Sequence, residues 1–260
     1  MSGYILCQNK KAERPYYIEN ISTNIYTIEE LCYFLFHNLY LVDQTVINEG
    51  LCTWIQKELE LPKLAAKLRP HLGKFSGAEE ILYPIFKEIN YLTYEELKVL
   101  NGMIRKLDGE PLAVREKKKG DALVENGMYV KAIRTYQRLL ERDDLEVAQE
   151  GLAGTVYHNL GCAYSYLFQM EKAVDCFWKA YEEKRDDHAL KVYLLAYRSI
   201  RTPIEYESRI SELNVGEEVG KDIREALDRF AKRPEKQVYS QHVDHTLENL
   251  IRDYHRSTGS

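Results

Sequence analysis

The amino-acid sequence predicts an all-α protein whose central part is a repeat of helical hairpins. Its 260 residues include 14 glycines and 7 prolines, fewer than the turns of a sheet-rich fold usually require. Signals for helix starts recur along the chain, and one series of small and aromatic residues occurs twice. Together these observations predict helices from residue 27 to about residue 256.

Composition limits the classes of protein that the chain fits. Hydrophobic residues make up 45% and charged residues 30%, which is typical of a globular protein. The net charge of −5 gives no overall basic excess for binding nucleic acid or an anionic membrane surface. The five cysteines form no CxxC pair, which favours reduced thiols. No apolar run reaches the length of a membrane span or a signal peptide, so we expect a cytoplasmic protein.

Residues 1–26 are expected to form an N-terminal arm. Residues 4–7 and residues 16–18 combine tyrosine with isoleucine or leucine and would also suit short strands. An ordered arm packed on the helices is the interpretation that we prefer.

Residues 27–110 are predicted to form a helical N-terminal region. Three of its helix starts have the capping-box pattern, in which a Ser or Thr hydroxyl and a Glu carboxylate each accept a hydrogen bond from a backbone N–H group. The three boxes pair Thr27 with Glu30, Ser76 with Glu79, and Thr93 with Glu96.

Further helices of this region follow from apolar spacing and from proline. One is expected to begin after Asp43 and to continue through Ile55, and another should have Pro62 in its first turn. Pro84 is expected to kink the helix after Ser76 or to end its first turns. Residues 108–111, Asp-Gly-Glu-Pro, should end the region.

Beyond residue 111 one pattern occurs twice. A glycine is followed by alanine two residues later, a large apolar residue three later, alanine twelve later and an aromatic residue sixteen later. Composition alone does not explain a shared series of this length. The first copy has Gly120, Ala122, Leu123, Ala132 and Tyr136, and the second has Gly161, Ala163, Tyr164, Ala173 and Phe177.

This series resembles the tetratricopeptide repeat, a unit of two antiparallel helices over about 34 residues. The resemblance covers residues 112–200 and implies an α-α superhelix in which the small residues let the two helices approach. Asn126-Gly127 would make the turn between helices, because glycine allows positive φ. The copies lie 41 residues apart, so we expect longer linking helices than in the standard repeat. Residues 202–256 are expected to be C-terminal helices that cap the stack, and Thr202-Pro203-x-Glu205 marks the start of one of them.

The resemblance implies binding of a protein or peptide partner, because such stacks commonly hold a peptide or helix on the concave face. We therefore expect a non-catalytic scaffold or adaptor without a cofactor, and a homo-oligomer is compatible with this. A regulatory sensor of a small peptide or ligand is the alternative. The candidate contacts are residues of the first helices that lie off the core stripe: Lys117, Lys118, Asp121, Glu125, His158, Asn159, Cys162 and Tyr166.

Some relatives hold a partner's C-terminus by a two-carboxylate clamp. By resemblance, Lys117 and Asn159 fall on clamp positions. Asp121 stands where the clamp has Asn, and Ala189 and Tyr193 stand where it has basic residues. Because Asp121 would repel a carboxylate, we do not expect a clamp here.

Other functions have weaker support in the sequence. A DNA-binding helix-turn-helix would lie in residues 27–58. This segment has five acidic residues and only one lysine, Lys57, the reverse of the balance that phosphate binding needs. The basic run at residues 115–119 suits a solvated helix start. No P-loop, GxGxxG, GxSxG or HExxH motif occurs, so no enzyme activity is expected.

Two pairs of residues that contain histidine resemble parts of a site. His242 and His245 supply too few ligands for a structural metal, so we expect no metal. Cys162 lies one helical turn from His158 and could form a thiolate pair, but no third orienting group is evident for catalysis.

Overall fold

The computed structural model describes residues 10–73, 79–231, 247 and 251–252. The chain divides into two units, Met1–Arg201 and Thr202–Ser260. The described residues form thirteen α-helices and a single two-stranded sheet, so the predicted all-α fold class is confirmed. The finer division at residues 26, 110 and 200 stays a prediction.

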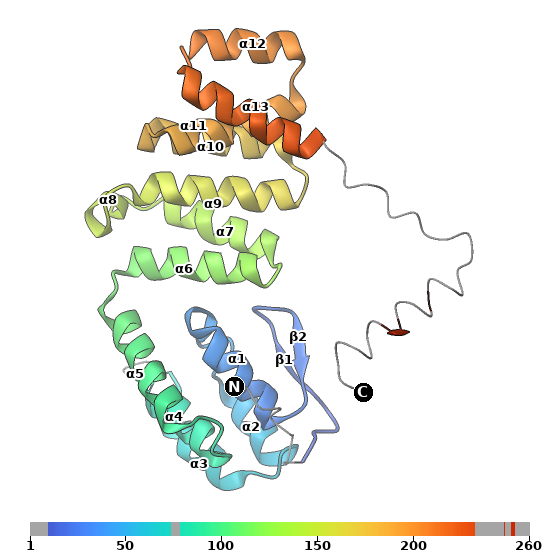
Figure 1. The fold of residues 1–260 in the computed structure, drawn as a ribbon. Helices are drawn as coiled ribbons and strands as arrows, with labels where there is room; N and C mark the ends of the chain where they lie inside the picture. The colour runs from blue at the N-terminus through green and yellow to red at the C-terminus, as the bar shows by residue number, and fades with distance from the viewer. Residues whose placement is uncertain (1–9, 74–78, 232–246, 248–250, 253–260) are drawn as a thin grey trace. The chain divides into compact units, whose positions relative to one another are not determined.

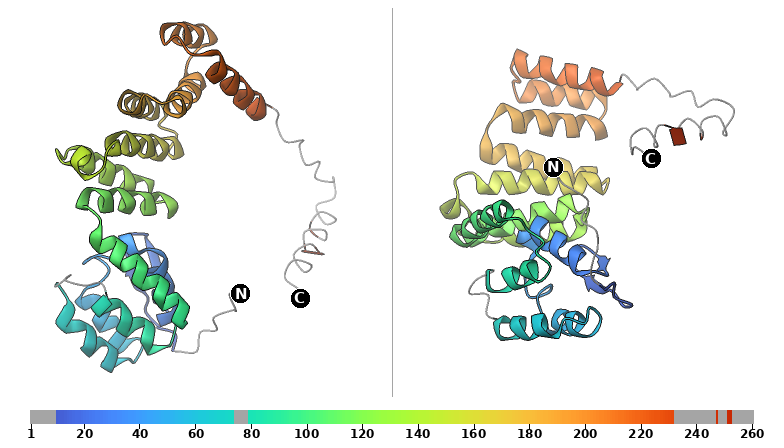
Figure 2. Two further views of the ribbon diagram at one scale, coloured as in Figure 1. Left: turned by 60° about the vertical axis from the view of Figure 1, so that its left-hand side comes forward. Right: turned by 60° about the horizontal axis from the view of Figure 1, so that its bottom comes forward.

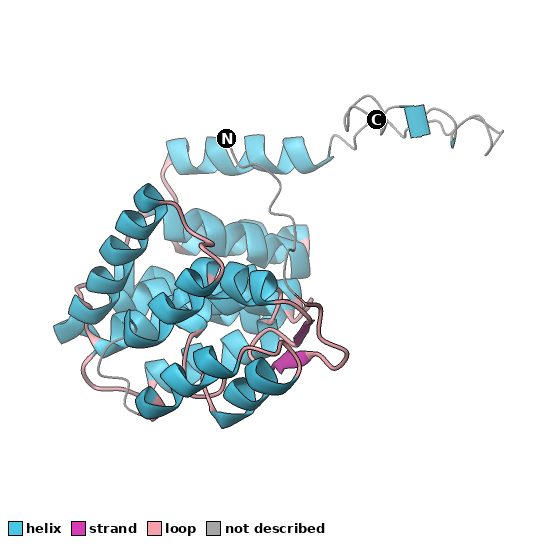
Figure 3. Ribbon diagram, turned by 90° about the horizontal axis from the view of Figure 1, so that it is seen from below, coloured by secondary structure: helices cyan, strands magenta, loops and turns pink. Residues whose placement is uncertain are grey.

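The N-terminal arm contains a β-hairpin, which corrects our preferred interpretation of residues 16–18. Strand β1 (Tyr16–Ile18) pairs antiparallel with β2 (Thr23–Ile25), and both strands are visible in magenta in Figure 3. Ile18 and Ile25 are buried, so the hairpin closes one side of the N-terminal core. Residues 4–7 lie outside the described residues.

Helix α1 (Ile28–His37) begins with the predicted capping box. The Glu30 backbone N–H donates to Thr27 Oγ1 over 3.2 Å, and the Thr27 N–H donates to Glu30 Oε2 over 3.1 Å. Leu31 and Leu35 on one face of the helix are fully buried. A 3-10 turn, η1 (Leu39–Leu41), follows.

Helix α2 (Glu49–Lys57) starts later than predicted. The Asp43 carboxylate accepts a hydrogen bond from the Thr45 N–H over 2.9 Å, which forms a turn. Asn48 then caps the helix by accepting from the Leu51 N–H over 3.1 Å. The apolar residues Val46 and Ile47 are buried in the connection and not in the helix.

The remaining N-terminal helices follow the predicted signals. Helix α3 (Pro62–Leu68) has Pro62 in its first turn, as predicted, and leads to the 3-10 turn η2 (Arg69–His71). Helix α4 (Glu79–Glu88) continues past Pro84, so the expectation that the proline ends it was wrong. The capping box predicted at Ser76 lies outside the described residues. Helix α5 (Tyr94–Gly109) has the predicted box at Thr93 and ends within residues 108–111.

The two sequence copies form two helical hairpins, which confirms the repeat. The first hairpin is α6 (Leu112–Glu125) with α7 (Tyr129–Leu140), and the second is α9 (Leu152–Tyr166) with α10 (Met170–Lys184). Helix α11 (Asp187–Ile200) packs on α10, and α7 packs on α9. The helices therefore follow one another as a stack (Figures 1 and 2).

The repeated glycines make room for the repeated aromatic rings. A Cβ atom built on Gly120 would lie 2.7 Å from Tyr136 Cζ, and one built on Gly161 would lie 2.6 Å from Phe177 Cε1. These separations are shorter than van der Waals contact between carbon atoms. Each glycine therefore lets an aromatic side chain of the second helix lie directly against the first helix.

We predicted longer linking helices between the copies, and this was wrong. The additional length lies in the connection between the two hairpins. Helix α7 ends at Leu140, and a separate short helix, α8 (Leu145–Ala148), precedes α9. Leu145 is buried and anchors this helix. Gly151, with φ at 66°, then turns the chain into α9.

The second unit contains α12 (Pro203–Glu212) and α13 (Glu217–Ala231). The predicted start of α12 is confirmed, because Thr202 and Glu205 form a complete capping box. Within the part of the chain that the structure describes, no helix combines the length and apolar character needed to cross a membrane.

Candidate functional site

The eight predicted contact residues lie on two neighbouring helices. Helix α6 carries Lys117, Lys118, Asp121 and Glu125, and α9 carries the others. Both are the first helices of their hairpins, and they are in contact with each other. The eight residues therefore come from equivalent elements of consecutive repeats.

A hollow of 320 Å³ lies between α6 and α9. Five of the eight predicted residues line it, together with two that the sequence analysis missed, Val124 and Tyr136. The position of Tyr136 could have been predicted, because its ring packs against Gly120 of α6. Its hydroxyl then reaches Asp121 on the same helix. The five predicted lining residues are Asp121, Glu125, Asn159, Cys162 and Tyr166.

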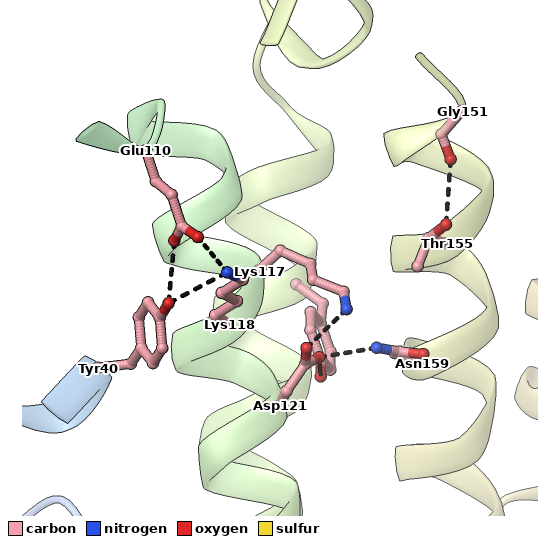
Figure 4. A network of polar contacts seen from close by, with 9 residues as sticks. Tyr40, Glu110, Lys117, Lys118, Asp121, Gly151, Thr155 and Asn159 are labelled. Atoms are coloured by element: carbon pink, nitrogen blue, oxygen red, sulfur yellow. Dashed lines mark hydrogen bonds and ion pairs between the residues drawn. The ribbon is translucent and has the colours of Figure 1, made fainter. Parts of the chain in front are cut away.

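The floor of this hollow is a polar network centred on Asp121. Its carboxylate accepts hydrogen bonds from Tyr136 Oη over 2.6 Å and from Asn159 Nδ2 over 2.7 Å. Lys117 Nζ forms an ion pair with the second oxygen at 2.6 Å. Figure 4 shows Lys117 and Asn159 directed at this carboxylate from the two helices.

Burial makes this network important for the fold. Tyr136 is 0% exposed, and burial together with the Asp121 carboxylate raises the pKa of its hydroxyl. The phenol therefore stays protonated and donates to Asp121. The carboxylate in turn ties α6 to α9 through Asn159, so these side chains fix the relative position of the two first helices.

Lys118 lies outside the hollow. Its ammonium pairs with Glu110, and it donates a hydrogen bond to Tyr40 Oη over 3.1 Å. Tyr40 Oη also donates to Glu110 Oε2 over 3.0 Å. Lys118 therefore connects the first repeat to the N-terminal region.

His158 and Cys162 contact each other, with Cys162 Sγ 3.7 Å from His158 Nε2. Burial raises the pKa of the Cys162 thiol. Burial, together with the neighbouring His188 and Lys184 side chains, lowers the pKa of the His158 imidazole. Both shifts favour the neutral forms, which is the reverse of the thiolate–imidazolium pair of a cysteine nucleophile.

Tyr166 lines the hollow, and two further aromatic side chains lie close to it, Tyr129 in space and Phe168 two residues along the chain. The rings of Tyr129 and Tyr166 are stacked, with centroids 4.6 Å apart and planes 9° apart. Tyr166 is 58% exposed and Phe168 is 90% exposed. Together with Glu125, which is also exposed, these side chains form what we call the aromatic rim.

Phe168 has a backbone conformation that is unfavourable for a bulky residue. Its φ is 56°, and Gly127, at the equivalent place in the first copy, has φ at 72°. The left-handed conformation costs a non-glycine residue about 1–2 kcal/mol, and an exposed ring recovers little of this by burial. Sequence analysis missed Phe168. The two copies are 41 residues apart, so Phe168 is the equivalent of Gly127 and occupies a turn that suits glycine.

The structure also locates the residues of the two-carboxylate clamp and of the candidate metal sites. The ammonium of Lys117 is held by Asp121, and Ala189 is buried, so the clamp positions hold no group free for a carboxylate. The described ranges contain no group of three or more His, Cys, Asp or Glu side chains arranged to hold a metal ion. His242 and His245 lie outside them.

A family model matches the sequence of the second hairpin. The tetratricopeptide repeat family model matches residues 154–187, which include most of α9 and all of α10. No curated protein and no solved structure gave a significant match. The match identifies the repeat by sequence at the place where the structure shows the second hairpin.

Proposed function

We propose that this chain, which contains tetratricopeptide-like helical hairpins, is a non-catalytic adaptor. In this proposal a peptide or a helix of a partner protein binds at the hollow between α6 and α9. Repeats of this family generally mediate protein–protein interaction.

The observation that carries the proposal is the hollow between the first helices of consecutive repeats. Its floor is fixed by the Asp121 network, which needs no rearrangement before binding. Preorganised polar groups lower the entropic cost of binding. The aromatic rim beside it has exposed rings of the kind enriched at interfaces.

The side chains around the hollow indicate what the partner offers. Glu125 is exposed and lines the hollow, whereas the Asp121 carboxylate is already paired with Lys117. Tyr129, Tyr166 and Phe168 offer apolar surface. A peptide with a basic side chain next to an apolar one would match both features.

Catalysis is not part of this proposal. The contact between Cys162 and His158 is the arrangement nearest to a nucleophile in the described hollow, and its pKa shifts keep both groups neutral. We place the adaptor in the cytoplasm, because Cys32, Cys52, Cys162 and Cys176 are free thiols.

Affinity capture from native cell lysate tests the proposal. The full chain is compared with the double variant Glu125→Lys/Tyr166→Ala, which changes the charge and the aromatic surface of the site. The matched control is Arg134→Ala/Glu182→Ala, two exposed positions on the second helices. Circular dichroism establishes that all three proteins are folded.

The proposal predicts that a set of captured proteins is lost from the site variant and kept by the control variant. Equal capture by all three proteins would place the binding surface elsewhere. Capture of no protein, with peptides recovered from the eluate by mass spectrometry, would favour the alternative of a small-peptide sensor.

A further inference from the structure

A second pocket, of 430 Å³, lies in the unit Met1–Arg201 where the N-terminal region meets the first repeat. Residues 39–43, the end of α5 and helices α6 and α7 contribute to its lining, and η1 packs directly on α6. It shares no lining residue with the hollow between α6 and α9. It is therefore a separate site.

Basic side chains outnumber acidic ones in the lining of this pocket, four to two. The acidic residues are Asp43 and Glu116, and the basic residues are Arg115, Lys119, Arg138 and Arg142. In a chain with a net charge of −5, this is a local reversal of sign. Such a lining favours an anionic ligand.

Two of the basic side chains are already neutralised by ion pairs. Lys119 Nζ lies 2.6 Å from Asp43 Oδ2. Arg142 pairs with Glu116 at 3.7 Å and with Asp144 at 2.7 Å. The pocket's own carboxylates are therefore engaged by these two residues.

Arg115 and Arg138 are left without a carboxylate partner among the described residues. The Nε atom of Arg115 is buried and has no hydrogen-bond acceptor. An arginine cannot shed its proton to relieve this, and a buried donor without an acceptor is unfavourable. An anion bound in the pocket would supply the acceptor.

Arg115 and Arg138 come from the two helices of one hairpin. Helices α6 and α7 turn at Gly127, and Arg115 and Arg138 lie at almost equal distances along the chain from that turn. Both line the same pocket. Two guanidinium groups on facing helices can each donate to one carboxylate.

A smaller cavity of 150 Å³ adjoins the pocket, and Arg115 lines both. Asp108 also lines it but forms no ion pair with Arg115 among the described residues. Its other lining side chains are all aliphatic: Leu39, Val42, Leu82, Ile104 and Leu107. The ligand that fits both cavities has a carboxylate directly beside an aliphatic group.

We propose that this pocket binds the C-terminal carboxylate of a polypeptide whose last residue is aliphatic. The terminal carboxylate accepts hydrogen bonds from Arg115 and Arg138, and the last side chain occupies the smaller cavity. A C-terminal leucine or isoleucine carries both groups on one residue. A phosphate ion would leave the aliphatic cavity unfilled.

Titration of the full, ¹⁵N-labelled chain with N-acetyl-Gly-Leu tests the proposal, with the arginine Nε–Hε signals in NMR spectra as the readout. The free acid should give saturable shifts of the Arg115 and Arg138 signals. The carboxamide of the same dipeptide should bind at least about tenfold more weakly, because it lacks the charge. N-acetyl-Gly-Ala should also bind more weakly, because it leaves the cavity unfilled.

Variants assign the effect to the pocket. Arg115→Gln and Arg138→Gln should each weaken binding of the free acid by about tenfold or more. Arg134→Gln, an exposed arginine of α7 outside the pocket, should bind as the unmodified chain does. If Arg115→Gln does not fold, Arg138→Gln decides, because Arg138 is exposed.

Four outcomes would overturn the proposal. Equal binding of the acid and the carboxamide would remove the carboxylate from the interaction. An unchanged affinity in Arg138→Gln would remove the arginine pair. Inorganic phosphate that binds as tightly as the dipeptide would make this a simple anion site, and octanoate that does so would make the ligand a fatty acid.

Discussion

Replacement of Gly161 by alanine tests whether the repeated glycines exist to admit the aromatic rings. The added Cβ would lie 2.6, 2.8 and 3.0 Å from Cε1, Cδ1 and Cζ of Phe177. Normal contact between carbon atoms is about 3.5–4.0 Å, so the ring must move by about 1 Å. Phe177 is only 5% exposed, which leaves it little space for this movement.

The expected magnitude is the difference between two opposing effects. Overpacking of a core costs about 1–3 kcal/mol. Alanine inside a helix gains about 1 kcal/mol over glycine. We therefore expect Gly161→Ala to lower the free energy of unfolding by up to about 2 kcal/mol, measured by urea denaturation.

A matched control separates the steric effect from helix propensity. Gly102 lies in α5, is exposed, and has no atom within 4 Å of an added Cβ. Gly102→Ala should therefore stabilise the protein by about 0.5–1 kcal/mol. If both variants were equally stabilising, Gly161 would not be needed for the contact with Phe177. Adding Phe177→Leu to Gly161→Ala should recover part of the loss, because the two sites are coupled.

Three further predictions follow from the hollow and its rim. Phe168→Gly should raise the free energy of unfolding by about 0.5–1 kcal/mol in urea denaturation, because it relieves the left-handed strain; an unchanged or lower value would contradict this. Asp121→Ala should destabilise by about 1–3 kcal/mol, because the Tyr136 hydroxyl loses its acceptor, and a background of Tyr136→Phe should reduce that loss. Alkylation of Cys162 by iodoacetamide, followed by peptide mass spectrometry, should have its pH midpoint above that of the same cysteine in the urea-unfolded chain, since burial raises its pKa; coincident midpoints would refute it.

Local signals in the sequence predicted the helix starts well. The capping boxes at Thr27, Thr93 and Thr202 are complete in the structure, because the donors and acceptors of such a box lie within one turn. The start of α2 was predicted wrongly, since Asp43 and Asn48 are both capping residues. Which of them begins the helix depends on the burial of the residues between them.

Contacts between distant parts of the chain could not be predicted from the sequence pattern. Lys118 falls on a first-helix position like its neighbours, yet Tyr40 and Glu110 hold it on the side of the N-terminal region. Spacing along α6 cannot reveal such partners. Likewise, the spacing of 41 residues between the copies showed that the repeat is longer than standard, but not where the additional residues lie. They form α8, whose position depends on the packing of Leu145.

The glycine and aromatic residues of the repeat could be predicted because each contact lies within one hairpin. Gly120 with Tyr136 and Gly161 with Phe177 have the same spacing and the same close approach. The hollow could be predicted in part for the same reason, because equivalent positions of the two first helices face each other. Phe168 was missed, although Gly127 at the same place in the first copy identified the turn.

Site-specific photo-cross-linking shows whether a partner protein binds at the hollow between α6 and α9. A photoreactive phenylalanine replaces Tyr166 in one protein and Arg134, exposed on α7, in another, and each is irradiated in native lysate. If the partner binds at the hollow, we expect covalent adducts with a partner protein from position 166 and none from position 134. Adducts from position 134 alone, or equally from both positions, would contradict it.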